Sequence, residues 1–238
     1  MIDFHSHILP NIDDGSKSLE DSIELIKEAK QVGFTKIIST SHYIEDYYDA
    51  NEEERTKLIN ELKEKVQDIG IELYLGNEIY ITNQITDLIA EKKASTINNS
   101  KYVLFELPMN SKPIDAKEVV FRLMEKGYVP IIAHPERYSY VKKDIEYVRE
   151  LAEMGALFQS NYGSCIGMYG NDAKKTQKKL LKEGLIHFFG SDVHRREQVY
   201  PQMPKILKKL SKIISEEELE LLTTINPQKV LDNEDIEI

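Results

Sequence analysis

The sequence predicts an α/β fold in which helices cover a parallel sheet, either doubly wound or closed into a barrel. Seven short apolar runs rich in Ile, Val, Tyr and Phe alternate with longer amphipathic segments. This alternation is typical of repeated strand and crossover-helix units. Near-continuous apolar strands favour a parallel sheet buried on both faces. No repeat, low-complexity tract or flexible linker divides the chain, so we expect one domain over residues 1–238.

The predicted strands cover residues 1–5, 36–41, 71–81, 102–107, 129–133, 156–160 and 186–190. The predicted helices cover 18–32, 52–69, 83–92, 115–126, 144–154 and 172–183, with further helix over 202–231. Capping residues support the first two helices. Ser18 with Asp21, and Asn51 before three glutamates, are typical helix starts, and Gly33 is a typical helix stop.

Composition excludes several classes of protein. The chain has 31 Lys and Arg against 41 Asp and Glu, a formal charge of −10, and no strongly basic run, which argues against nucleic-acid binding. No apolar run is long enough for a transmembrane helix, and the N-terminus lacks the basic and apolar regions of a signal peptide. The single cysteine, Cys165, cannot form an internal disulfide. We therefore expect a cytoplasmic protein.

Ionisable side chains gather at the carboxyl ends of the predicted strands. These ends share one edge of a parallel sheet or one mouth of a barrel, where active sites of such folds lie. Five of the six histidines and four carboxylates belong to this set: His5, His7, Asp14, His42, Glu78, Glu106, His134, Asp192 and His194. Each alone is more often structural, but together they are costly unless cations neutralise them. The set therefore predicts a metal site.

The residue types narrow the choice of metal. His5 and His7 are two apart in an extended strand, so both side chains can grip one ion. Imidazole with carboxylate suits zinc, manganese or iron(II) better than calcium or magnesium. Nine ligands are too many for one ion, so we expect two or three, with Glu78 as a bridge. His187 lies within the last strand, away from this set, and is expected to be structural.

Five motifs together resemble the polymerase and histidinol phosphatase (PHP) superfamily. Within it they are similar to the manganese-dependent protein-tyrosine phosphatases of Gram-positive capsule and exopolysaccharide clusters. The motifs are HSH at 5–7, LPNIDDG at 9–15, GNEI at 76–79, IAHPER at 132–137 and GSDVH at 190–194. The resemblance spans residues 1 to about 194, most of the chain.

The resemblance implies a PHP-type distorted (β/α)7 barrel with a trinuclear, manganese-preferring site, for which iron and zinc are alternatives. One ion would be held by His5, His7, Glu78 and Asp192, a second by Glu78, Glu106 and His134, and a third by Asp14, His42 and His194. The implied reaction is hydrolysis of phosphotyrosine on the tail of a cognate bacterial tyrosine kinase that regulates polysaccharide export.

Further catalytic residues follow from this reaction. Glu106 counts both as a ligand and as a catalytic group. Arg137 is placed to bind a phosphate oxygen, the alternative being a surface salt bridge with Glu136. Relatives carry an arginine followed by proline after the last motif, whereas here Tyr200 precedes the proline. Either Arg195 or Arg196 supplies the charge, or Tyr200 makes the contact.

Cys165 lacks the phosphate loop of cysteine-dependent phosphatases, so we expect it to be a packing residue. Three other functions stay open. They are a phosphatase of small metabolites such as histidinol phosphate, a phosphodiesterase or exonuclease, and a metal-stabilised, non-catalytic module that binds a kinase. The acidic composition counts against a nucleic-acid substrate, and the complete ligand set counts against loss of catalysis.

Overall fold

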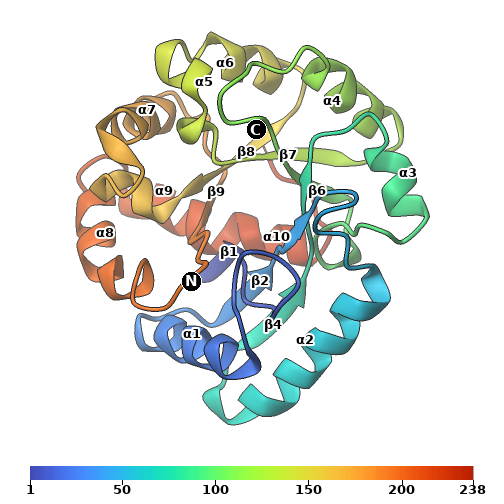
Figure 1. The fold of residues 1–238 in the computed structure, drawn as a ribbon. Coiled ribbons are helices and arrows are strands. Elements are labelled where there is room, and N and C mark those ends of the chain that lie inside the picture. The colour runs from blue at the N-terminus through green and yellow to red at the C-terminus, as the bar shows by residue number, and fades with distance from the viewer. Residues whose placement is uncertain (238) are drawn as a thin grey trace.

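The computed structural model describes residues 1–237 and shows strands at the centre of a ring of helices (Figure 1). All pairings between its strands are parallel. One sheet has the order β1-β2-β4 and the other β3-β5-β6-β7-β8-β9. The strands are β1 (Ile2–Ser6), β2 (Lys36–Ser39), β3 (His42–Tyr43), β4 (Glu72–Leu75), β5 (Glu78–Tyr80), β6 (Tyr102–Glu106), β7 (Val129–Ala133), β8 (Leu157–Asn161) and β9 (Phe188–Gly190).

The two sheets form one barrel. β2 pairs with β4 at Ser39 and Leu75, and β3 pairs with β5 at His42 and Glu78. In both pairs the partner residues are 36 positions apart in the sequence (75 − 39 and 78 − 42), so the register is the same on either side of the break. β2 and β3 are therefore two parts of one interrupted strand, and β4 and β5 are two parts of its neighbour. At the other edge, the amide of Asp192 after β9 donates to the carbonyl of His5 in β1, at 2.8 Å. The predicted seven-stranded barrel is confirmed.

The prediction of one continuous strand over 71–81 is wrong, because the backbone leaves the ladder at Gly76 and Asn77. A Cβ on Gly76 would lie 2.6 Å from Cδ1 and 3.3 Å from Cα of the buried Ile97, so a larger residue would force Ile97 to move. The Asn77 amide donates to the carbonyl of Ser41, while its oxygen accepts the amide of Ser95. These side-chain bonds support the chain where β2 and β4 are interrupted, while the backbone amides of Gly76 and Glu78 still donate to the carbonyls of Ser39 and Thr40.

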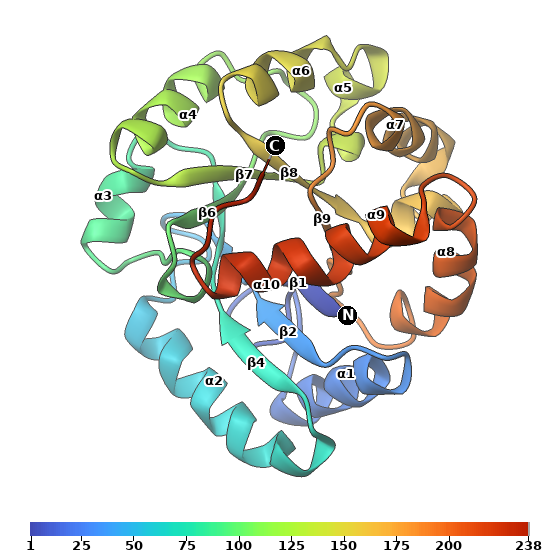
Figure 2. The same ribbon diagram turned by 180° about the vertical axis from the view of Figure 1, so that it is seen from behind.

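Apolar side chains fill the barrel interior, including Ile2 and Phe4 of β1, Leu104 of β6 and Phe188 of β9. The rings of Phe4 and Phe188 stack with centroids 4.2 Å apart. Figure 2 shows α10 (Asn226–Leu231) crossing one end of the barrel, where Val230 joins this cluster. One end of the barrel is thus closed by apolar packing, which leaves the opposite mouth for polar residues.

The predicted helices are present. All have shorter bounds except the one predicted over 172–183, which begins two residues earlier and ends one residue earlier. They are α1 (Leu19–Gln31), α2 (Glu52–Val66), α3 (Ile85–Ala90), α4 (Ala116–Glu125), α6 (Glu146–Glu153) and α7 (Gly170–Lys182). The short α5 (Ser139–Lys143) was not predicted. Ser18 and Asn51 cap α1 and α2 as expected. Among the described residues, no helix is both long and apolar enough to span a membrane.

The segment 202–231 is broken rather than continuous, which corrects the prediction there. It contains α8 (Met203–Leu210), α9 (Glu216–Glu220), a π-helical turn at Leu221–Ile225 and α10. Ser215 caps α9 by accepting the amide of Glu218 at 3.1 Å, so a new helix starts there. Pro227 in the first turn of α10 has no amide hydrogen and crowds the carbonyl four residues back, which fits the widened turn before it.

Candidate metal centre

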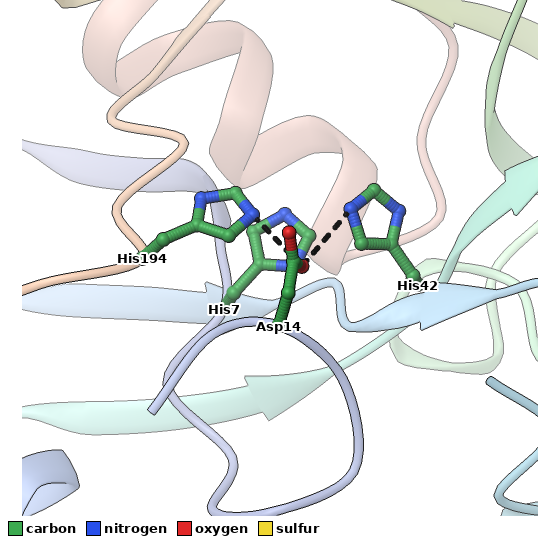
Figure 3. Close-up of side chains that lie close together, drawn as sticks. All are labelled: His7, Asp14, His42 and His194. Atoms are coloured by element: carbon green, nitrogen blue, oxygen red, sulfur yellow. Dashed lines mark ion pairs between the residues drawn. The ribbon is translucent and has the colours of Figure 1, made fainter. Parts of the chain in front are cut away.

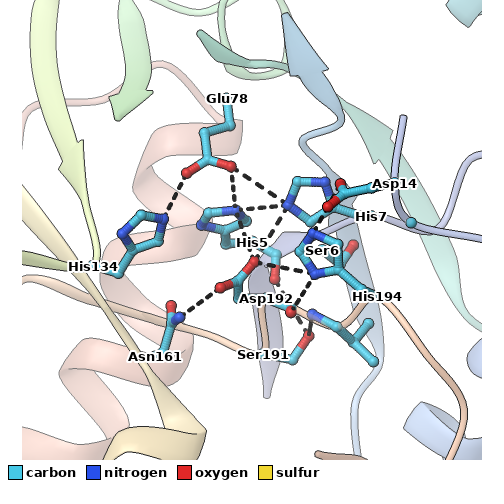
Figure 4. A network of polar contacts seen from close by, with 12 residues as sticks. His5, Ser6, His7, Asp14, Glu78, His134, Asn161, Ser191, Asp192 and His194 are labelled. Atoms are coloured by element: carbon cyan, nitrogen blue, oxygen red, sulfur yellow. Dashed lines mark hydrogen bonds and ion pairs between the residues drawn. The ribbon is translucent and has the colours of Figure 1, made fainter. Parts of the chain in front are cut away.

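All nine predicted ligands lie around the open mouth of the barrel, and Figure 4 labels all of them except His42 and Glu106. They come from strand ends and from the loops that follow β1 and β9, as the parallel topology requires. The residues are His5, His7, Asp14, His42, Glu78, Glu106, His134, Asp192 and His194. Most are buried, whereas half of the Asp14 side chain is exposed. The structure therefore brings the whole predicted set together.

The imidazole rings of His5 and His7 face each other through their Nε2 atoms. Nδ1 of His5 lies 2.8 Å from the side-chain oxygen of Gln159, and Nδ1 of His7 lies 2.9 Å from a carboxylate oxygen of Asp13. Both partners are acceptors, so each Nδ1 carries the hydrogen and donates it. In each neutral ring Nε2 then holds a lone pair, and these two atoms are 3.1 Å apart. Two facing lone pairs at this distance repel unless a cation, either a proton or a metal ion, lies between them. Burial lowers the pKa of both histidines, but the neighbouring carboxylates outweigh it and raise both pKa values, so the site attracts positive charge.

A chain of amides fixes the His5 tautomer. The Gln159 amide donates to Asn161 at 2.9 Å, and the Asn161 amide donates to Asp192 at 2.7 Å. Because Asp192 as a carboxylate only accepts, both amide orientations are determined, and the Gln159 oxygen is left facing His5. Sequence reasoning missed Asp13, Gln159 and Asn161. Two features of the sequence could have indicated them: the acidic pair at 13–14 and the polar residues at the end of the predicted 156–160 strand.

Two carboxylates complete the first group. Oε2 of Glu78 lies 3.2 Å from Nε2 of His5 and 3.5 Å from Nε2 of His7. Oδ1 of Asp192 lies 3.6 and 3.4 Å from the same atoms. Four electron-pair donors thus converge, all on buried side chains. This arrangement fits a divalent cation and matches the first set that the resemblance implied.

A second group is more exposed and is shown in Figure 3. Oδ1 of Asp14 lies 3.3 Å from Nε2 of His194 and 3.6 Å from Nε2 of His42. The His7 ring stacks on His194 with centroids 4.0 Å apart, and His7 also lies within ligand distance of this group. The resemblance implied only Asp14, His42 and His194, so His7 lies between two groups.

The third group differs from the implied one. Nδ1 of His42 lies 3.1 Å from Glu78 and 3.4 Å from Glu106, so His42 turns its two ring nitrogens towards two groups. Nδ1 of His42 is buried and has no hydrogen-bond partner among the described residues. His134 instead approaches only the other oxygen of Glu78, at 2.8 Å. Glu78 is therefore at the centre, with both of its oxygens in use.

The crowding of these groups shifts their pKa values in opposite directions. Burial alone would raise the pKa of Glu78, but His5, His42 and His134 hold it well below the usual range. Burial, then the charges of Glu78 and Asp192, raises the pKa of Glu106 to about 9. Burial, then Arg137, lowers the pKa of His134 to about 4. A divalent cation favours both ionised carboxylates and neutral imidazoles, so it would remove this conflict.

Arg137 lies at the edge of the mouth. Its Nη1 donates to Oδ2 of Asp192 at 2.6 Å, and its guanidinium lies 4.6 Å from the centroid of the Tyr169 ring. The alternative of a salt bridge with Glu136 is wrong. That buried carboxylate instead accepts hydrogen bonds from the backbone amide of Asn161 and from the Ser164 hydroxyl. A quarter of the Arg137 side chain is exposed, so the guanidinium can still meet a ligand.

The three other candidates for phosphate contact, Arg195, Arg196 and Tyr200, have different partners in the structure. Arg195 donates to the backbone carbonyls of Asp14 and Gly15, whereas Arg196 faces the carboxylates of α1 at 3.9 Å. Tyr200 is fully buried, and its hydroxyl donates to Asp3 at 2.7 Å. A side chain without exposed surface cannot bind a substrate, so the alternative of a phosphate contact by Tyr200 is wrong.

The remaining two residues are buried away from the mouth. His187 accepts the amide of Phe158 on Nδ1 at 3.1 Å, and burial lowers its pKa to about 4. Cys165 lies in a short turn after β8, and burial raises the pKa of its thiol to about 11. Both environments are those expected of structural residues.

A buried arginine supports the strand breaks that orient the ligands. Arg55 of α2 is fully buried and donates to Ser95 at 3.1 Å. Ser95 donates in turn to the side chain of Asn77, which precedes Glu78 and also binds the carbonyl before His42. Two central ligands therefore share one hydrogen-bonded support.

Comparison with known proteins agrees with this site. Residues 1–232 match the family model described as capsular polysaccharide synthesis, CpsB/CapC. CapC of Staphylococcus aureus is 40% identical over 197 residues, 82% of this chain and 77% of its own. The tyrosine-protein phosphatase YwqE of Bacillus subtilis is 32% identical over 238 residues, 99% of this chain and 93% of its own.

Solved structures give the same result. A crystal structure from work on YwqE and on CpsB of Streptococcus pneumoniae, described as metal-dependent tyrosine phosphatases, matches with a TM-score of 0.93 and 32% identity. It covers 100% of this chain and 96% of the other. Histidinol phosphate phosphatase of Lactococcus lactis shares only the fold, with a TM-score of 0.55 and 15% identity over 89% of this chain and 92% of its own. This chain belongs to the CpsB/CapC family.

Proposed function

We propose that this protein is a metal-dependent protein-tyrosine phosphatase that hydrolyses phosphate monoesters without a covalent intermediate. The observation that carries the proposal is the pair of lone-pair nitrogens of His5 and His7, surrounded by Glu78 and Asp192. Nearly end-to-end similarity to relatives named tyrosine-protein phosphatases supports the choice of substrate.

The proposed cofactor is two or three divalent ions, manganese first, with iron and zinc also suited to the ligands. When bound, such ions neutralise phosphate oxygens and lower the pKa of water near them. His5, His7, Glu78 and Asp192 would hold one ion. Asp14, His194 and His42 would hold another with His7. Glu78 and Glu106 would hold a third, with His42 on one side and His134, which the resemblance implies, beside the other oxygen of Glu78.

The protein's own side chains supply the rest of the chemistry. Arg137, oriented by Asp192 and Tyr169, is proposed to donate to a phosphate oxygen as negative charge shifts in the transition state. Glu106 is proposed as both a ligand and an acid–base group, because its carboxylate lies at the mouth, 3.4 Å from Nδ1 of His42. Arg195 is proposed to hold the Asp14 loop and Arg196 to act outside the site.

The proposed substrate is the phosphotyrosyl tail of a cognate bacterial tyrosine kinase, in the cytoplasm, with capsule or exopolysaccharide synthesis as the regulated process. The description of the family as one of capsular polysaccharide synthesis supports this assignment.

A comparison of three substrates tests the proposal. The protein is treated with a chelator, reloaded separately with Mn²⁺, Fe²⁺ or Zn²⁺, and assayed on a phosphotyrosyl peptide, histidinol phosphate and single-stranded DNA. We expect turnover of the peptide alone, lost on chelation and restored best by Mn²⁺. Full activity of metal-free protein would refute the proposal. A preference for histidinol phosphate would show that the protein is a phosphatase of small metabolites. Binding of a kinase without turnover of any substrate would show that it is a non-catalytic module.

A further inference from the structure

A groove of about 510 Å³ opens beside the metal centre. It lies between the loop after β1, the loop before α2, and α2 itself. Its lining includes Ile12, Tyr47, Asp49, Leu58 and Glu61. The volume is in the range of pockets that bind small ligands, about 300 to 1,000 Å³.

The groove is continuous with the mouth. The backbones of Ile44 and Tyr48 exchange two hydrogen bonds of 2.8 Å, which holds the intervening turn in shape. This turn places the Tyr48 ring nearly parallel to that of His42, with centroids 6.0 Å apart, and the Tyr47 ring against Tyr48 at 4.5 Å. Aromatic surface therefore runs from a candidate metal ligand into the groove, and Tyr47 at its end is 71% exposed.

The lining of the groove combines apolar and acidic side chains. Ile12, Leu58 and the two tyrosines supply apolar and aromatic surface. Asp49, Glu54 and Glu61 supply three carboxylates against one ammonium, that of Lys57. Glu54 and Glu61 each lie three or four residues from the adjacent pair Lys57 and Leu58 along α2, so the four side chains form one helical face.

We propose that this flank groove binds the polypeptide next to the phosphotyrosine of a protein substrate and selects basic side chains beside apolar ones. The proposal rests on the proposed function and deepens it. A phosphate at the metal centre needs positive charge around it, whereas the groove offers the opposite sign, so the two surfaces recognise different parts of one substrate. Residues two or three positions from the phosphotyrosine extend about 7 to 10 Å along the chain, enough to enter the groove.

The test compares peptides with a small substrate on the manganese-loaded protein. Phosphotyrosyl peptides carry three lysines, three alanines or three glutamates on one side of the phosphotyrosine, in both directions. The readout is kcat/KM for each peptide divided by kcat/KM for p-nitrophenyl phosphate. We expect the lysine peptide to exceed the glutamate peptide by about 10-fold at low salt, with the ratio shrinking at high salt.

Three variants locate the effect. Combining Asp49→Lys with Glu61→Lys should abolish or reverse the lysine preference, and Tyr47→Ala should lower the peptide ratio by about 3-fold. Glu64→Lys, on the same helix but outside the groove, is the matched control and should keep the wild-type preference. An equal preference in wild type and the double variant would overturn the proposal, as would a wild-type preference for glutamate. Absence of turnover of every substrate would instead refute the proposed function.

Discussion

Nε2 of His5 lies 3.1 Å from Nε2 of His7, and each atom holds a lone pair when its ring is neutral, because the ring's other nitrogen donates to Gln159 or Asp13. The geometry of the candidate centre therefore depends on residues that need not touch an ion. Such outer partners fix the tautomer and direction of an imidazole and make it a stronger ligand.

Substitution of Gln159 tests this dependence. Gln159→Leu removes the acceptor for Nδ1 of His5, so the ring loses its fixed tautomer, and we expect about a 10- to 100-fold loss of Mn²⁺ affinity. Calorimetric titration of the metal-depleted protein measures it. Gln159→Glu keeps an acceptor and should retain most of the affinity. Equal affinities of the leucine variant and the wild type would refute the role assigned to Gln159.

Glu78 should be the most sensitive ligand. One of its oxygens faces His134 and the other faces His5, His7 and His42, so its loss disturbs more than one group. We expect Glu78→Ala to lower kcat more than His5→Ala or His134→Ala, while far-ultraviolet circular dichroism stays unchanged. Near wild-type turnover of Glu78→Ala would show that it bridges no ions.

Alanine substitutions of Arg137, Arg195 and Arg196 should have different kinetic effects, because the three side chains make different contacts. Arg137→Ala should lower kcat by roughly 100-fold or more, because a guanidinium that tightens on the transition state is lost. Arg195→Ala should mainly raise KM for a phosphopeptide, since the Asp14 loop loses its anchor, and Arg196→Ala should be near neutral. Steady-state measurement of kcat and KM for the three variants tests these expectations. A silent Arg137→Ala would move the phosphate contact elsewhere.

Cys165 should be dispensable. Its thiol is buried and its raised pKa keeps it protonated near neutral pH, so it is a poor nucleophile. We expect Cys165→Ser to keep almost full kcat and alkylating reagents to leave the native enzyme active. Inactivation by both changes would revive a thiol–phosphate mechanism.

Sequence patterns predicted the barrel and the gathering of the nine candidate ligands at its mouth because both depend on local order along the chain. Apolar runs locate the strands, and ionisable residues just after them must share one mouth in a parallel barrel. The break in the 71–81 strand was not predictable in this way. It depends on Asn77 meeting Ser41 and Ser95, and on Gly76 meeting Ile97, contacts that only the folded chain creates.

The same limit applies to individual side chains. Tyr200 precedes the proline after the last motif, and its hydroxyl meets Asp3, 197 positions away, inside the protein. The sharing of ligands between groups depends on ring orientation, as with the two nitrogens of His42, which spacing alone does not specify.

His187 predicts how stability depends on pH. Burial lowers its pKa to about 4, whereas an unfolded histidine titrates near 6.5, so between these values the unfolded chain binds more protons. This contribution is complete above pH 6.5 and is lost as the pH falls towards 4. Because the side chain is 7% exposed, the loss approaches about 3 kcal/mol at most.

Substitution of His187 isolates that contribution. His187→Gln removes the titration but keeps an oxygen that can accept the Phe158 amide. Urea unfolding of both proteins in chelator, at several values between pH 4 and 7, compares them without any contribution from bound metal. We expect the wild type to lose more free energy of unfolding than the variant as the pH falls, with most of the difference between pH 6.5 and 4. Parallel curves would mean that protonated His187 is accommodated in the fold.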